Sequence, residues 1–124
     1  MHSLSHTAMG FVGFSFACMV VDYLTGIIAA AHAQSIASHS MKKGLLHKAM
    51  YLLILTLASV ADMFGVSGSI GIPIDFSVVC ATAIIAIECS SILENACAVE
   101  PRLADSPIGA IFAKVEPKHS RKEQ

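Results

Sequence analysis

Residues 8–31 read AMGFVGFSFACMVVDYLTGIIAAA, and within them the only charged side chain is that of Asp22. Two more apolar stretches follow, at about residues 45–66 and 76–99. About 20 predominantly apolar residues suffice for a helix to cross the hydrocarbon core of a bilayer. The sequence therefore predicts an all-α membrane protein with three transmembrane helices.

The composition leaves little room for any other kind of domain. Of 124 residues, 55% are hydrophobic and 14% are charged, whereas soluble domains carry about 25% charged residues. We expect residues 1–100 to form one transmembrane domain and no catalytic domain. The sequence predicts no enzyme activity, no cofactor, no nucleic-acid partner and no small-molecule substrate.

The cysteines and histidines do not suggest a metal site. The four cysteines lie in or beside apolar stretches without a CxxC pair, at positions Cys18, Cys80, Cys89 and Cys97. Free cysteines in apolar surroundings behave as small hydrophobic residues. The six histidines are scattered over polar segments and do not cluster as ligands.

Each apolar stretch contains an acidic residue: Asp22, Asp62 and Glu88. A carboxylate at the bilayer centre costs about 2.5–3.5 kcal/mol on insertion scales, so such acids are expected to contact protein or a water-lined lumen. Asp62 lies near the end of its span, which leaves an interfacial position as the alternative. The sequence shows no evident lysine or arginine partner for these acids inside the membrane.

The basic residues predict the orientation. Lys42, Lys43 and Lys48 flank the first connector, and five more basic residues follow the third span, whereas the N-terminus and residues 65–73 have none. By the positive-inside rule, the first connector and the C-terminus face the cytoplasm and the N-terminus faces outward. Lys42, Lys43 and Lys48 are expected to anchor this topology, with Lys48 extending to the cytoplasmic headgroups.

Two segments outside the central spans allow alternatives. Ala31-His32-Ala33 resembles a signal-peptide cleavage site, but the preceding apolar stretch is long and has no basic start, so we expect a retained span. Residues 101–124 are predicted to be a short polar cytoplasmic tail. Within it, the apolar residues 104–112 suggest a short interfacial helix.

Helical spacing predicts a small and polar face on the first span. Asp22, Thr25, Gly26 and Ala30 recur at intervals of three and four residues. Small residues allow helices to approach closely in lipid, and Gly13 and Ala17 have a similar spacing. We expect these residues to contact other helices or other subunits.

The third span is polar on two sides. Glu88, Ser91 and Asn95 share one face, and Glu94 projects from the other. Such a helix is expected to contact neighbouring helices, other subunits or water. The alternative is that the membrane ends near Ile87, which would place Glu94 in the cytoplasm.

Four segments together resemble the phage holin family, which includes toxin-secretion and clostridial phage lysis holins. They are VDYLTGIIAA at residues 21–30, GLLHK at 44–48, Ala61-Asp62, and ECSSILEN at 88–95. The chain departs from the family at residues 98–102, where members commonly have a Gly-x-Pro-x-Pro turn. The resemblance therefore covers the three spans and does not extend to the C-terminal region.

The resemblance implies a multi-pass homo-oligomer in the bacterial cytoplasmic membrane. Its lesions would let a phage endolysin reach the cell wall and lyse the host. Asp22 and Glu88 would be protonated or hydrogen-bonded in packed oligomers and would line a wetted opening after rearrangement. The alternatives are a toxin-export holin, an antiholin, or a small ion-coupled carrier. The apparent lack of a basic partner in the membrane argues against the carrier.

Overall fold

The computed structural model describes residues 3–110 and is helical, with no strand in that part of the chain. Its long helices are α1 (His6–His32), α2 (Ser38–Met63) and α4 (Phe76–Val99). All three are long and apolar enough to cross a membrane, which confirms the predicted fold class. Two short elements are α3 (Val66–Ser69) and the 3₁₀ helix η1 (Pro101–Asp105), and residues 107–110 at the end of the described chain are helical as well.

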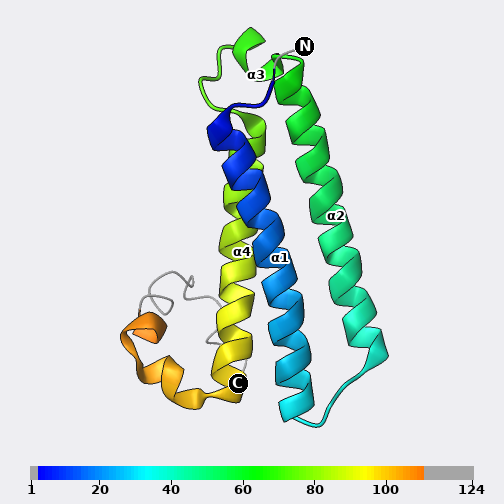
Figure 1. Cartoon of the computed structure of the whole chain (residues 1–124), viewed down its shortest axis with the longest axis vertical. Coiled ribbons are helices and arrows are strands. Elements are labelled where there is room, and N and C mark those ends of the chain that lie inside the picture. Colours follow the sequence, from blue (N-terminus) through cyan, green and yellow to red (C-terminus); the bar gives the residue numbers. More distant parts are fainter. Residues whose placement is uncertain (1–2, 111–124) are drawn as a thin grey trace, which may run out of the picture.

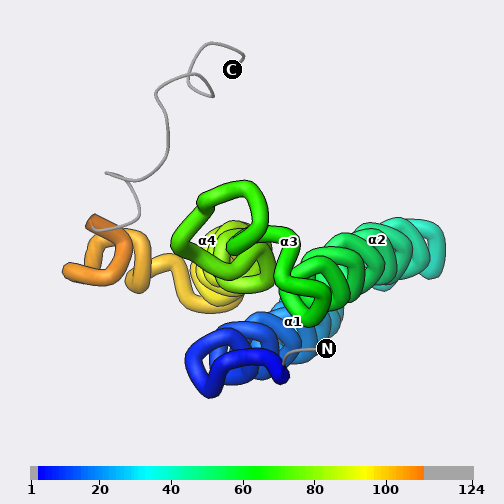
Figure 2. The backbone as a smooth tube through the Cα atoms, turned by 90° about the horizontal axis from the view of Figure 1, so that it is seen from above, coloured from blue at the N-terminus to red at the C-terminus, as the bar shows by residue number. Residues whose placement is uncertain are grey.

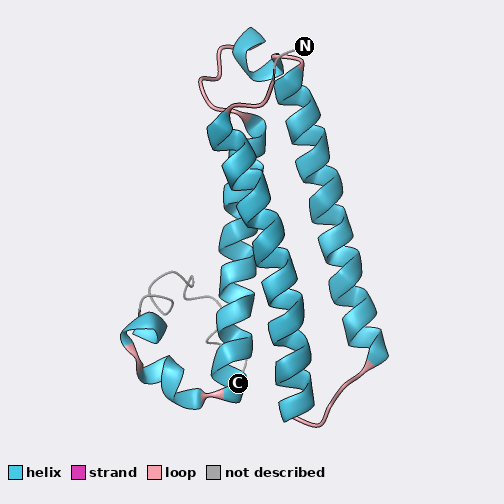
Figure 3. Ribbon diagram, in the orientation of Figure 1, coloured by secondary structure: helices cyan, strands magenta, loops and turns pink. Residues whose placement is uncertain are grey.

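The long helices alternate in direction (Figures 1 and 3). Residues 33–37 join α1 to α2 at one end of the bundle, where α4 also finishes; we call this the loop end. The start of α1 and the short helix α3 lie at the opposite end, which we call the α3 end. The structure does not itself orient these ends in a membrane, so a cytoplasmic loop end is still a prediction.

The three helices are packed unequally. α1 lies along α4, whereas α2 contacts α4 less extensively and α1 very little. Figures 1 and 2 show α2 diverging from the other two helices toward the loop end. The core is correspondingly small, with Met19, Leu55, Ala81 and Ile84 at its centre.

Most of the apolar surface faces outward. Only 11–22% of the residues in the most apolar window of each long helix are buried. Exposed side chains include Leu24, Ile28, Leu46, Leu53 and Leu57. In water such a surface would be unfavourable, whereas lipid tails are as apolar as these side chains.

The helix bounds differ from the expected spans mainly in α2. Residues 76–99, expected as the third span, are those of α4, whereas α2 begins at Ser38, seven residues before the expected span at residue 45. Hydropathy reports the apolar part of a helix, and residues 38–43 contain no glycine or proline to interrupt it. The first connector, expected between the spans at residues 32–44, is therefore largely helical.

Glycine and proline mark the other helix boundaries. Gly65 has a φ of 70°, in the left-handed region that ends many helices, and the connection between α2 and α4 that it opens contains α3. Pro101 opens η1, where its missing N–H costs no helical hydrogen bond. Within the expected interfacial helix at 104–112, residues 107–110 are helical, whereas residues 111–112 and the tail beyond them lie outside the described residues.

Candidate functional site

Lys48 links all three long helices through its ammonium group. Its Nζ donates to Asp22 Oδ2 on α1 at 2.6 Å and to Glu88 Oε2 on α4 at 2.7 Å. The side chains of Lys48 and Asp22 are each 13% exposed, and that of Glu88 is 3% exposed. We call Asp22, Lys48 and Glu88 the charge cluster.

The cluster forms because its members lie at the same height. Asp22 is ten residues before His32, Lys48 is ten residues after Ser38, and Glu88 is eleven residues before Val99. At 1.5 Å per residue, each is about 15 Å from the loop end of its helix. The hydrocarbon core of a bilayer is about 30 Å thick, so this height is compatible with burial well inside the membrane.

The expectation that Lys48 extends to the headgroups, and that the acids lack a basic partner, is wrong. Both carboxylates lie within hydrogen-bonding distance of the ammonium. In a medium of low dielectric constant, a paired charge is far more favourable than an unpaired one. Lys42 and Lys43 are exposed, and their role as topology anchors is still a prediction.

The small and polar face of α1 lies against α4 of the same chain. Asn95 Nδ2 donates to Asp22 Oδ1 at 3.1 Å and to Thr25 Oγ1 at 3.2 Å. A Cβ at Gly26 would lie 3.6 Å from Asn95 Nδ2, in ordinary van der Waals contact, so this side of the glycine packs directly against α4. Part of the predicted face is thus an internal helix contact.

The remaining candidates are divided between the helix interface and the surface. Ala30 and Ser91 line a cavity beside the charge cluster. Glu94 is exposed, on the side of α4 away from that cavity, as the helical spacing predicts. Gly13 and Ala17 are exposed as well, and a Cβ at Gly13 would meet nothing within 4 Å.

The cavity extends from Asp22 and Lys48 to residues 35–40 at the loop end and has a volume of about 240 Å³. Ser35 and Ser40 lie on its wall near the loop, and Asp22 and Lys48 lie on its wall deeper in the bundle. Polar groups thus continue from the end of the bundle to the charge cluster. We call this space the loop-end cavity.

Asp62 has a different role from the charge cluster. Its Oδ1 accepts from Phe76 N at 2.8 Å, and its Oδ2 accepts from Ser77 N at 2.7 Å and from Ser77 Oγ at 2.6 Å. The carboxylate therefore caps the start of α4, where Asp75 makes no side-chain cap bond. Asp62 is 8% exposed, so it is buried at the α3 end.

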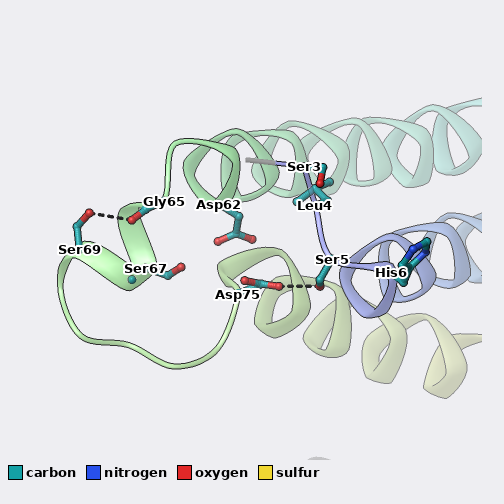
Figure 4. Close-up of a pocket in the computed structure, with 10 residues that line it drawn as sticks. Ser3, Leu4, Ser5, His6, Asp62, Gly65, Ser67, Ser69 and Asp75 are labelled. Carbon is teal, nitrogen blue, oxygen red and sulfur yellow. Dashed lines mark hydrogen bonds between the residues drawn. The ribbon is translucent and has the colours of Figure 1, made fainter. Parts of the chain in front are cut away.

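A second contact at the α3 end was not predicted. Ser5 Oγ accepts from Ala8 N at the start of α1 and donates to Asp75 Oδ2 at 3.0 Å (Figure 4). Together with Asp62, it ties the start of α1 and the end of α2 to the start of α4. These residues line an open cavity of about 680 Å³. No periodicity along a single helix indicates such a contact.

The other reactive side chains form no centre in the described part of the chain. All four cysteines are free; Cys18 is buried and the rest are half-buried. No group of three or more histidine, cysteine, aspartate or glutamate residues within 3–110 is arranged to hold a metal ion.

Residues 3–106, which contain every long helix and the whole charge cluster, match the sequence profile of the bacteriophage holin family. The chain belongs to this family. Holins are non-enzymatic membrane proteins, so the three apolar helices belong to a multi-pass membrane protein of the holin type. No curated protein and no solved structure matches the chain.

Proposed function

We propose that this holin-type protein oligomerises in the bacterial cytoplasmic membrane and opens lesions through which a phage endolysin reaches the cell wall. Membership of the holin family carries the proposal. The charge cluster supports it by providing a polar contact inside an otherwise apolar bundle.

In the closed state, the cluster would keep α2 attached to α1 and α4. Separating Lys48 from both acids within hydrocarbon would leave the ammonium and at least one carboxylate unpaired, and each unpaired charge is costly there. A single copy in lipid would therefore stay closed. Many copies could accumulate without permeabilising the membrane.

In the open state, α2 would separate from the α1–α4 pair, because it has the least extensive packing of the three helices. Water would then hydrate the charge cluster, and the polar face of α4 with Ser91 and Asn95 would line the opening. Gly13 and Ala17, which face outward, would be available for contact between subunits.

Induced expression in a bacterium tests the proposal, with and without a co-expressed endolysin that has no export signal. We expect an abrupt fall in membrane potential, followed by lysis only in the culture that makes the endolysin. Lysis in both cultures, or neither depolarisation nor lysis with the protein stably inserted, would contradict the proposal.

A small ion-coupled carrier is the second candidate. The buried ion pairs and the loop-end cavity favour it, because carriers bind ions between helices near the bilayer midplane. Stable growth with saturable ion uptake would support this alternative. An antiholin would delay the lysis caused by a separate holin, and a toxin-export holin would release its cargo without lysis.

A further inference from the structure

The charge cluster contains more acid than base. One ammonium lies between two carboxylates, so the fully ionised cluster has a formal charge of −1. An unbalanced charge inside a membrane is unfavourable, and a bound proton would remove it. We propose that the charge cluster is a proton-binding site that water reaches from the loop end alone.

The contacts of the two acids indicate which one carries the proton. Asp22 accepts hydrogen bonds from both Lys48 and Asn95. Glu88 accepts from Lys48, and its side chain is the less exposed of the two. Fewer stabilising donors and deeper burial both favour the neutral form, so the proton resides on Glu88.

The position of the acids relative to each other supports a bound proton. Asp22 Oδ2 and Glu88 Oε2 contact the same ammonium, at 2.6 Å and 2.7 Å, so the two carboxyl groups are close neighbours. Two carboxylates that are close neighbours repel each other, and a proton bound to one of them removes that repulsion. The other titratable groups near Glu88 are the thiols of Cys18 on α1 and Cys89 on α4.

The loop-end cavity supplies the route for the proton. Its 240 Å³ would hold about eight waters at their volume in the liquid, about 30 Å³ each. The hydroxyls of Ser35, Ser40 and Ser91 and the amide of Asn95 provide hydrogen-bond partners along its wall. A continuous file of water can thus connect the end of the bundle to Asp22 and Lys48.

Toward the α3 end, the route is closed by apolar packing. Met19 is one turn from Asp22, and Ile84 is one turn from Glu88. Both belong to the buried core that also contains Leu55 and Ala81. Water therefore reaches the cluster from one side, which is the cytoplasmic side under the predicted orientation.

Proton release changes the balance of charge in the bundle. The O–H bond of Glu88 breaks, its electron pair stays on the carboxylate, and the proton passes by way of the neighbouring carboxylate of Asp22, which lines the loop-end cavity, to a water there. The cluster then carries the unbalanced negative charge, which favours hydration over burial. The proton site depends on the contacts within one chain and does not require the chain to form lesions.

Infrared spectroscopy of the full chain in lipid bilayers tests the bound proton. At neutral pH, we expect a carbonyl absorption of a protonated carboxyl group that shifts in deuterated water and is lost in Glu88→Gln. Glu94→Gln, a matched change at an exposed position of α4, should keep it. Absence of the band from the wild type, or its persistence in Glu88→Gln, would overturn the assignment.

Thiol labelling tests access from one side. In a chain whose native cysteines are replaced, Ile27→Cys lies on the cavity wall, and Ile28→Cys is a matched control at nearly the same depth whose parent side chain is 57% exposed on the outer face. A membrane-impermeant thiol reagent should modify Ile27→Cys from the loop end only and leave Ile28→Cys unmodified. Labelling of Ile27→Cys from the α3 end, or from neither end, would overturn the one-sided route.

Discussion

Lys48 Nζ lies 2.7 Å from Glu88 Oε2, although the two residues are 40 positions apart in the sequence. The same ammonium contacts Asp22, 26 positions before it. One side chain thus holds the second helix against both of the others at a single height. Since α2 has little other contact with α1, the stability of the bundle should depend strongly on this residue.

Replacing Lys48 with methionine should destabilise the bundle. The change keeps most of the side-chain volume but leaves two acids without their cation, and removing one partner of a buried ion pair typically costs about 3–5 kcal/mol. Denaturant unfolding of the purified protein in detergent measures the loss. Lys43→Met, at an exposed position, is the matched control, and equal stability of the two variants would show that the ion pairs contribute nothing.

Glycine positions on the two sides of α1 should respond differently to leucine. Gly26→Leu should separate α1 from α4, because a Cβ there already contacts Asn95 Nδ2 and the longer side chain needs more room. Gly13→Leu should leave the single chain intact and weaken contact between copies. Unfolding and chemical cross-linking in membranes distinguish these effects, and the same response in both variants would contradict the assignment of the two faces.

Loss of the Asp62 carboxylate should loosen the start of α4. Asp62→Ala removes three accepted hydrogen bonds and leaves the amides of Phe76 and Ser77 without their cap, at a cost of about 1–3 kcal/mol. Hydrogen exchange should accelerate at these amides while the amide of Asn95 stays protected. Asp105→Ala, at an exposed site, serves as control. Unchanged exchange at Phe76 and Ser77 would show that the cap is dispensable.

Glu88→Gln should delay lysis if the proposed function is correct. The amide can still accept a hydrogen bond from Lys48 but cannot acquire the negative charge that favours hydration. Culture density after synchronous induction measures the delay, and Glu94→Gln should keep the wild-type timing. Earlier lysis in Glu88→Gln, or identical timing, would show that ionisation of Glu88 does not promote opening.

The sequence predicts the spans well because each one depends only on local composition. Residues 76–99 coincide with α4, and the helical repeat correctly groups Glu88, Ser91 and Asn95 on the side of α4 that faces the bundle. Periodicity identifies the face of a helix but not the residue opposite it. That pairing depends on the relative heights and tilts of the helices.

Lys48 and Asp62 illustrate this limit. Lys48 is the fourth residue of its expected span, a position typical of an interfacial anchor. Its partners become evident only when Asp22 and Glu88 are found at the same height on the other two helices. From the sequence, Asp62 resembles an interfacial acid. In the structure, the loop after α2 places the start of α4 against its carboxylate. Both contacts require the tertiary fold.

The attachments of α2 give it the geometry of a lever. Its end is fixed at Asp62, the contact at Lys48 is 14 residues away, and Ser38 is 24 residues away. At 1.5 Å per residue these arms are about 21 Å and 36 Å long. A rigid rotation about Asp62 that parts Lys48 from its acids would move Ser38 about 1.7 times as far, so the widest displacement would fall at the loop end.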